Sequence, residues 1–162
     1  MCANFQNKLK VTFFSVLCLL PFSKVMAVCS LAVSGMSFGE YDVSSPINLD
    51  SIGTINLNCT NMNNQPQTVS ISMGVSSVSN LITNRKMKTI SGNDTLNYNL
   101  FLDATYSSVW GNTIGLDTFT QTIMPTSGGT TQSNITVFGR IPAGQDVSVG
   151  VYSDSVTVTI LP

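Results

Sequence analysis

The sequence contains no histidine and few carboxylates, and both shortages exclude classes of chemistry. Without histidine the chain cannot form a Ser-His-Asp or Cys-His catalytic arrangement. Glu40 is the only glutamate, and no spacing among the aspartates pairs two carboxylates for glycoside hydrolysis. No clustered set of oxygen ligands indicates a calcium site. We therefore predict that the protein is not an enzyme and uses no cofactor or metal.

Positive charge is also scarce, which argues against a nucleic-acid partner. The 162 residues include seven lysines and arginines, and charged residues make up 9% of the chain. Lys8, Lys10 and Lys24 lie in a predicted N-terminal signal, whereas all eight acidic residues follow it, so the remainder carries four basic residues against eight acidic ones. Binding to DNA or RNA depends on positive charge. The surface must instead consist mainly of Ser, Thr, Asn and Gln, which suits contacts with other subunits outside the cell.

The first 27 residues have the composition of a secretory signal peptide. Lys8 and Lys10 supply a positive n-region, residues 11–22 are apolar, and a short stretch ending at Ala27 provides a signal-peptidase site. The apolar run is shorter than the about 20 residues that a membrane-spanning helix needs; a membrane anchor is the alternative reading. We predict that residues 1–27 are removed on export and that residues 28–162 form one domain.

Only two of the four cysteines lie in the predicted exported domain. Cys2 and Cys18 fall in the signal, which leaves Cys29 and Cys59. A pair of cysteines in an exported protein indicates a disulfide. A metal site is the alternative, but the absence of histidine and of a CxxC motif disfavours it. The bond would close a loop of about 30 residues, which the chain-entropy model values at roughly 3–4 kcal/mol.

The exported part alternates apolar and polar residues in short runs, as β-strands do. Turn residues separate the runs, and no helical stripe of useful length follows the signal. A β-sandwich is therefore the expected architecture. The alternation places Cys29 and Cys59 with the apolar side chains, so their bridge should lie in the core. The expected strands fall within residues 29–33, 55–59, 69–73, 96–102, 135–141, 147–151 and 156–160.

Two polar stretches, residues 76–94 and 111–129, are expected to be loops. The first contains Arg85, Lys86 and Lys88, the only cluster of positive charge. We interpret this cluster as part of a solvated loop, with a patch for acidic partners as the alternative. Trp110, the only tryptophan, is expected to be a buried core anchor rather than an exposed binding residue.

A series of short motifs then follows in an order that is typical of one family. The motifs are Phe38-Gly39-x-Tyr41, Arg85-x-Met87, Leu96-x-Tyr98-x-Leu100-Phe101-Leu102-Asp103, Val109-Trp110-Gly111, Val137-Phe138-Gly139-Arg140-Ile141-Pro142-Ala143-Gly144-Gln145 and Gly150-x-Tyr152-x-Asp154-Ser155. Cys29 precedes all of them, and Cys59 follows the first of them. The sequence resembles the spore coat protein U domain family across nearly the whole exported part. That family includes subunits of archaic chaperone–usher pili.

The resemblance implies an immunoglobulin-like sandwich that lacks its last strand. A periplasmic chaperone would lend a strand to the gap, and at an outer-membrane usher a neighbouring pilin subunit would replace it by β-augmentation. The residues agree in one respect, because the chain ends on an apolar strand whose edge no later strand covers. We place the donor-strand groove between the first and last strands, at Leu31, Val33, Val156, Val158 and Ile160.

The predicted cleavage site also bears on the position in a fibre. If cleavage follows Ala27, only Val28 precedes Cys29, whereas fibre subunits of this family carry a longer extension with alternating apolar residues. We therefore predict a tip or other terminal subunit at the cell surface, reached through the periplasm, with a role in adhesion and biofilm formation. Residues 61–67 and 111–129 are candidate contact loops. The alternatives are a self-sufficient secreted β-sandwich adhesin or lectin-like module, and a coat or matrix protein.

Overall fold

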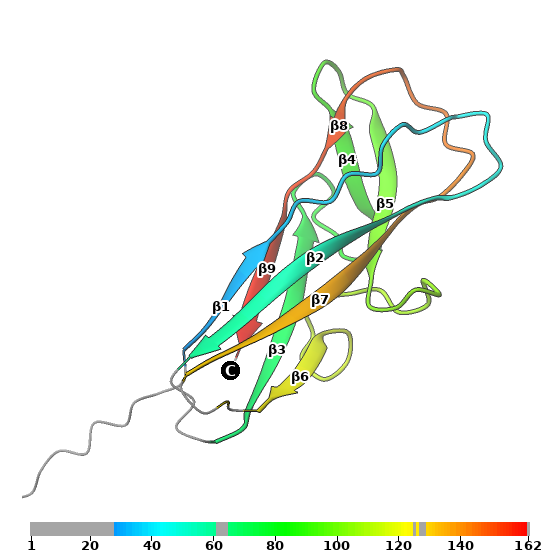
Figure 1. The fold of residues 1–162 in the computed structure, drawn as a ribbon. Coiled ribbons are helices and arrows are strands. Elements are labelled where there is room, and N and C mark those ends of the chain that lie inside the picture. Colours follow the sequence, from blue (N-terminus) through cyan, green and yellow to red (C-terminus); the bar gives the residue numbers. More distant parts are fainter. Residues whose placement is uncertain (1–27, 61–64, 125, 127–128, 162) are drawn as a thin grey trace, which may run out of the picture.

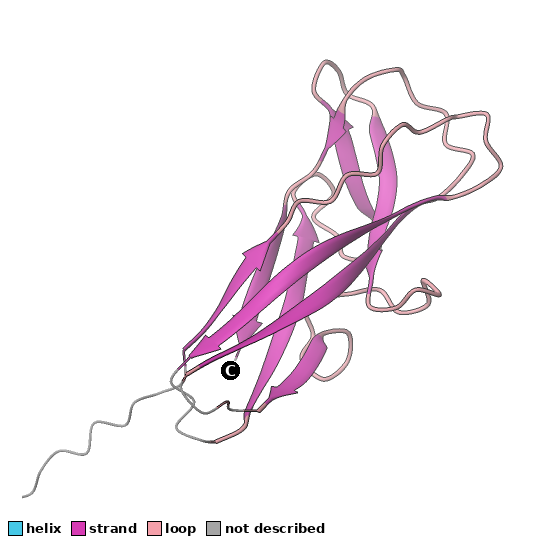
Figure 2. Ribbon diagram, in the orientation of Figure 1, coloured by secondary structure: helices cyan, strands magenta, loops and turns pink. Residues whose placement is uncertain are grey.

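The computed structural model describes residues 28–60, 65–124, 126 and 129–161. Every regular element within these ranges is a β-strand (Figure 2). The predicted signal, residues 1–27, lies outside them. No helix of the described chain is both long and apolar enough to cross a membrane.

The strands form two antiparallel sheets that pack face to face (Figure 1). The first sheet has the order β1-β2-β7-β5-β4-β8, and the second has the order β6-β3-β9. The chain therefore crosses from the first sheet to the second between β8 and β9. The strands are β1 (Val28–Val33), β2 (Leu49–Thr60), β3 (Gln67–Ser76), β4 (Arg85–Thr89), β5 (Thr95–Phe101), β6 (Phe119–Ile123), β7 (Thr130–Ile141), β8 (Tyr152–Ser153) and β9 (Val156–Leu161).

The core lies between the sheets and is built from the alternating apolar residues that the sequence predicts. Ile55 and Leu57 on β2 and Ile71 on β3 are completely buried. Full burial of one such side chain stabilises the fold by about 1.5–3 kcal/mol. Trp110 is also completely buried, and its indole N–H donates a hydrogen bond to the carbonyl of Ile71 at 2.9 Å. The interpretation of Trp110 as a core anchor is thus confirmed.

Three expectations about local structure are wrong. Residues 147–151 alternate apolar and polar side chains but form no strand, because none of the described strands pairs with them; Val149 is fully exposed. Residues 111–129, expected to be a loop, contain β6, since Thr and Gln side chains can line a strand that pairs with β3. Residues 76–94, the other expected loop, contain β4, which buries Arg85 and Met87.

Candidate functional site

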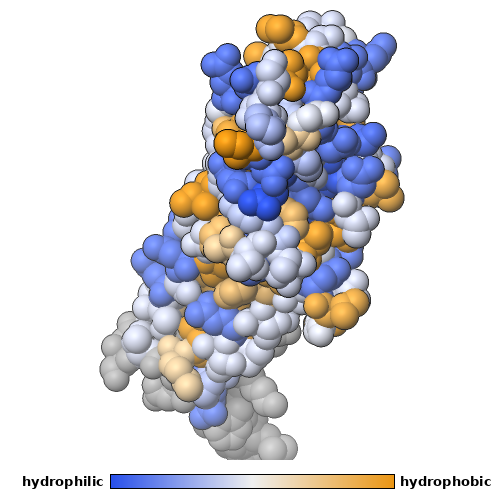
Figure 3. Space-filling view, turned by 90° about the vertical axis from the view of Figure 1, so that its right-hand side faces the viewer, coloured by the Kyte–Doolittle hydropathy of each residue, from blue (hydrophilic) through white to orange (hydrophobic). Residues whose placement is uncertain are grey.

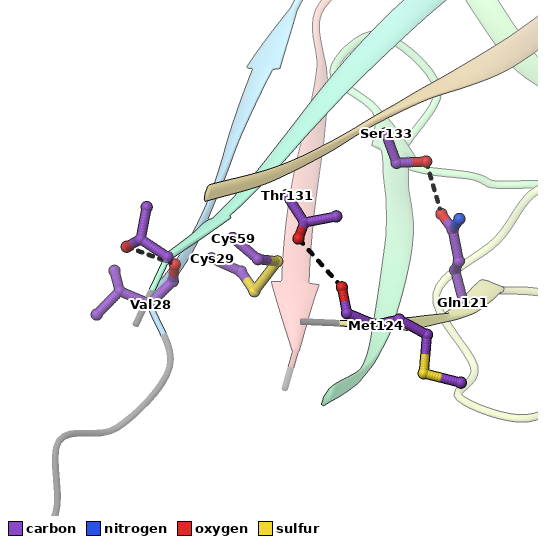
Figure 4. Close-up of a disulfide and its surroundings, with 8 residues drawn as sticks. Val28, Cys29, Cys59, Gln121, Met124, Thr131 and Ser133 are labelled. Carbon is purple, nitrogen blue, oxygen red and sulfur yellow. Dashed lines mark hydrogen bonds between the residues drawn. A yellow bond between two sulfur atoms is a disulfide. The ribbon is translucent and has the colours of Figure 1, made fainter. Parts of the chain in front are cut away.

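The disulfide fixes the first strand to its neighbour. Cys29 on β1 and Cys59 on β2 lie directly opposite each other in the antiparallel register. Their sulfur atoms are bonded at 2.07 Å (Figure 4). Cys59 is completely buried and Cys29 is half-buried, so the bridge borders the core as expected. The bond anchors β1 at the edge of the first sheet.

One lateral side of the sandwich is closed by side-chain hydrogen bonds between the sheets. The Ser133 hydroxyl on β7 donates to the Gln121 side-chain oxygen on β6 at 3.0 Å. Just beyond β6, the Thr131 hydroxyl donates to the Met124 carbonyl at 3.1 Å (Figure 4). These contacts join β7 to the β6 edge and hold the two sheets together on this side of the described chain.

The opposite lateral side is open. β1 is the edge strand of the first sheet and β9 is the edge strand of the second, and each pairs with one neighbour only among the described strands. The two strands lie side by side without pairing with each other (Figure 1). Their facing backbone edges are therefore free to accept hydrogen bonds from, and donate them to, an added strand.

The inward side chains at this open side are less buried than those elsewhere in the core. Val156, Val158 and Ile160 on β9 point inward but are only half-buried. Val33 on β1 is 52% exposed, whereas Ile55, its partner across the β1–β2 ladder, is completely buried. Apolar side chains aligned with a core but partly exposed to water indicate that a layer of the core is missing there.

A cleft of about 360 Å³ opens between the two edges. Three of the five residues of the predicted donor-strand groove line it: Val33, Val156 and Val158. Leu31 and Ile160, the other two predicted groove residues, pack against the core but do not line the cleft. The cleft reaches core side chains from both sheets. These are Met73, Met87, Leu100 and Val137, which also line it.

Sequence reasoning missed the segment that follows β1 and forms one wall of the cleft. Ser34 continues the ladder through its amide, which donates to the Thr54 carbonyl at 3.0 Å. Beyond Gly35 the chain turns into the sandwich, and Met36 and Phe38 pack on Gly139. A Cβ at Gly139 would lie 2.3 Å from the Met36 sulfur and 2.8 Å from a Phe38 ring carbon. Glycine on β7 therefore makes room for this wall.

A polar group bounds the cleft where the chain crosses between the sheets. The Asp154 carboxylate accepts hydrogen bonds from the Tyr98 hydroxyl at 2.7 Å and from the Ser77 hydroxyl at 2.6 Å. Partial burial would raise the pKa of Asp154, but these hydrogen bonds outweigh it and hold the pKa below its ordinary value. Burial, reinforced by Asp154, raises the pKa of Tyr98. The carboxylate is thus ionised and the phenol neutral at neutral pH.

Arg85 is not a surface cation, contrary to the interpretation of its cluster as a solvated loop. It is completely buried, and desolvation lowers the pKa of its guanidinium. Its Nη2 donates to the carbonyls of Gly74 and Trp110, both at 2.8 Å, and its Nη1 donates to Asn99 Oδ1 at 2.7 Å. Arg85 therefore joins β4 to β3, to β5 and to the Trp110 loop, and it is not available to an acidic partner.

Nothing in the described part of the chain forms a metal centre, since no three acidic or cysteine side chains gather there. Fold and cleft together define a class: a disulfide-bonded, all-β sandwich that is closed along one lateral side and open along the other.

Comparison with known proteins gives the family. The model of the Spore Coat Protein U domain matches residues 14–159. Protein U of Myxococcus xanthus is 31% identical over 131 residues, which cover 77% of this chain and 70% of that protein. The chain therefore belongs to the Spore Coat Protein U domain family. This family comprises structural proteins, so the conclusion that the chain is not an enzyme holds.

A solved structure is similar in fold. It is the CsuC–CsuE chaperone–tip adhesion subunit pre-assembly complex of the archaic chaperone–usher Csu pili of Acinetobacter baumannii. The match has a TM-score of 0.52 and 22% identity, and it covers 84% of this chain. The chain spans only 40% of the solved chain that it matches. Together with the two antiparallel sheets, this match confirms the predicted immunoglobulin-like β-sandwich.

Proposed function

We propose that the protein is a structural subunit of a chaperone–usher surface pilus, and that its cleft accepts a strand from another polypeptide. The observation that carries this proposal is the open side of the sandwich. Two strand edges face each other there above a cleft of about 360 Å³, and the inward side chains of both remain partly exposed. An added strand would pair with the free backbone edges and insert alternate apolar side chains into the cleft.

The same geometry explains why the subunit needs partners. An unpaired apolar edge promotes aggregation unless another strand covers it. A periplasmic chaperone would cover it during export, and a neighbouring pilin subunit would replace the chaperone at an outer-membrane usher. The similarity to a chaperone–tip subunit pre-assembly complex supports a chaperone as one of these partners. The missing strand of the immunoglobulin-like sandwich is then supplied in trans.

A substitution in the cleft tests the proposal against a matched control. Val158 lines the cleft, whereas Thr159, the next residue on β9, faces outward and is exposed. We expect Val158→Asp to abolish pull-down of the tagged chain with its chaperone, because a carboxylate would be buried without a partner. Thr159→Asp should leave pull-down unchanged. Equal binding by both variants would contradict the placement of the groove.

Expression without the chaperone separates this function from its main alternative. An incomplete sandwich should be degraded or aggregate when the chaperone is absent. A soluble, stable monomer would instead indicate a self-sufficient secreted adhesin or lectin-like module. Assembly into a shell around resting cells, without any usher, would favour a coat or matrix protein.

We further propose a tip or other terminal position in the fibre. This rests on the predicted signal cleavage after Ala27, which would leave only Val28 before the disulfide-bonded Cys29. A subunit with so short an extension could accept a strand but could not donate one. N-terminal mass spectrometry of the exported protein tests the proposal, and cleavage well upstream of Ala27 would overturn it.

The loop end remote from the disulfide is the surface that we propose for adhesion. The loops between β1 and β2, between β4 and β5 and between β7 and β8 meet there. The Asn48 side chain accepts a hydrogen bond from the Ala143 amide at 3.0 Å, and the Ile90 amide donates to the Val151 carbonyl at 3.1 Å. Ile47 and Ile90 are 73% and 76% exposed, and Val149 is fully exposed. Figure 3 shows apolar residues at the surface of this end.

Exposed apolar side chains on three linked loops suit contact with an apolar surface. The contact loops expected from the sequence, residues 61–67 and 111–129, lie elsewhere and stay a prediction. Residues 61–64 lie outside the described chain, and β6 occupies part of residues 111–129. Cells carrying Ile47→Ser with Val149→Ser should form less biofilm on polystyrene than cells carrying Leu116→Ser, a change at an exposed residue elsewhere. Equal biofilm formation would contradict the assignment.

A further inference from the structure

The outward face of the β2–β7 ladder carries a regular set of side chains that strand acceptance does not use. Both strands are 12 residues long and pair along their whole length. Because alternate residues face the core, the others form rows across the outside of the sheet. Along the strands these rows are Asp50–Arg140, Ile52–Phe138, Thr54–Thr136, Asn56–Asn134, Asn58–Gln132 and Thr60–Thr130.

Aromatic rings gather at one end of these rows, on the solvent side of the sheet. Phe138 pairs with Phe101 on β5, and Tyr106 lies against both, with ring centroids 5.5 Å from Phe101 and 6.4 Å from Phe138. We call Phe101, Tyr106, Phe138 and Ile52 the aromatic platform. All three rings are partly exposed and Ile52 is 66% exposed. Outward faces of sandwich sheets are normally polar, so this platform requires an explanation.

The loop between β5 and β6 holds Tyr106 in place at an energetic cost. Tyr106 has φ of 59°, a left-handed conformation that is uncommon for a bulky residue. Asp103 enforces it by accepting hydrogen bonds from the amides of Thr105 and Ser108 at 2.9 and 2.8 Å. The Tyr106 ring thereby stacks on the Arg140 guanidinium, whose Cζ lies 3.6 Å from the centroid of the ring. Strain of this kind is found preferentially at binding sites, where a side chain must be presented in a fixed position.

The rows of the β2–β7 ladder carry no unpaired charge that would attract an ionic partner. Arg140 donates to both carboxylate oxygens of Asp50, at 2.7 and 2.8 Å, so the charges of this pair offset each other. The four rows from Thr54–Thr136 to Thr60–Thr130 contain only hydroxyl and amide side chains. These groups both donate and accept hydrogen bonds. A ligand that matches them must be uncharged and rich in groups that do the same.

We propose that this outward face binds a neutral polysaccharide. The apolar face of a sugar ring would stack on the aromatic platform, and its hydroxyls would exchange hydrogen bonds with the Thr and Asn rows. A second copy of this chain fits less well, because it would bury rows of amides that each need a partner. The site lies on the opposite side of the sheet from the cleft, so it does not depend on strand acceptance.

Binding of the exported chain, purified in complex with its chaperone, to neutral dextran, cello-oligosaccharides and chito-oligosaccharides tests the proposal, with dextran sulfate as the charged comparison. Tyr106→Asn removes the ring while keeping a residue that tolerates the left-handed backbone. We expect at least one neutral glycan to bind, and this variant to bind it about 3- to 10-fold more weakly, the effect of losing one aromatic contact.

Two further variants separate a local role from a general one. Asn134→Asp, on a central row, should weaken binding to neutral glycans, whereas Leu116→Asn, at an exposed position outside the rows, should not. The proposal is overturned if no neutral glycan binds, if Tyr106→Asn binds as the unmodified chain does, or if dextran sulfate binds better than dextran. It is also overturned if the unmodified chain dimerises in sedimentation and Asn134→Asp prevents this.

Discussion

Replacement of Arg85 by methionine should destabilise the fold more than any surface change. The guanidinium is completely buried and donates to the carbonyls of Gly74 and Trp110 and to the side chain of Asn99. Methionine has a similar length but no donor. The carbonyls would then remain in the core without this hydrogen bond, at the point where β3 bulges between Met73 and Ser76 and meets the Trp110 loop.

The expected loss follows from the contacts that disappear. Leaving a buried acceptor unsatisfied costs about 1–3 kcal/mol. The two shortest carbonyl contacts, to Gly74 and Trp110, therefore predict a decrease of about 2–6 kcal/mol in the free energy of unfolding. Release of the desolvated charge offsets part of this loss, which favours the lower half of the range. Typical domains have about 5–15 kcal/mol in total, so the variant would be close to unfolding.

Trp110 provides the assay, because it is the only tryptophan and is completely buried. Urea unfolding followed by its fluorescence gives the free energy of each form. Lys88→Met, an exposed change on the same strand, should alter stability by less than about 0.5 kcal/mol. Arg85→Lys should fall between the two, since lysine keeps a charge but not the planar set of donors. If Arg85→Met and Lys88→Met were equally stable, the buried guanidinium would not be holding these carbonyls.

Three further outcomes follow from the contacts described above. Replacing both Cys29 and Cys59 by alanine should lower the free energy of unfolding by roughly 3–4 kcal/mol, and urea curves unaffected by the change would contradict this. Gly139→Ala should lower the free energy of unfolding by about 1–3 kcal/mol, because the added methyl group would clash with Met36 and Phe38. Met36→Ala in the same chain should recover part of this loss. Strictly additive effects in a double-mutant cycle would show that the two sites are not in contact. Arg140 holds the pKa of Asp50 below its ordinary value. The ion pair therefore stabilises the fold at a pH above the carboxyl pKa of the unfolded chain. This stabilisation is lost as the pH falls through the pKa that Asp50 has in the folded protein. Asp50→Asn should therefore cost at most about 1 kcal/mol at neutral pH and nothing in strong acid, and a pH-independent difference in melting temperature would refute the assignment.

Much of the fold could be predicted from alternation along the chain. Ile55, Leu57 and Cys59 repeat at every second position, and their burial on one face of β2 follows directly. The same pattern at residues 147–151 predicted a strand that does not exist. Alternation specifies two faces, but a strand also needs a neighbour to pair with, and the sequence of one segment does not reveal its neighbours.

The cleft was predicted less completely than the strands around it. Of the predicted groove residues, Val33, Val156 and Val158 line it, whereas the wall formed by Met36 and Phe38 was missed. Its signal was Gly139, whose lack of a side chain admits these residues from a segment about a hundred positions earlier in the chain. Arg85 was misread for a related reason: arginine is rarely buried, and here carbonyls from distant segments satisfy it.

By itself, the sequence determined the all-β class, the strands with regular alternation, the pairing of Cys29 with Cys59 and the absence of catalytic chemistry. These depend on residue types and on periods of two along the chain, which can be read locally. The tertiary structure alone decided that one side of the sandwich is closed and the other open, that Arg85 lies in the core, and that Tyr106 rests on the outer face. Each of these is a relation between segments remote in sequence, and it exists only once packing has brought their side chains together.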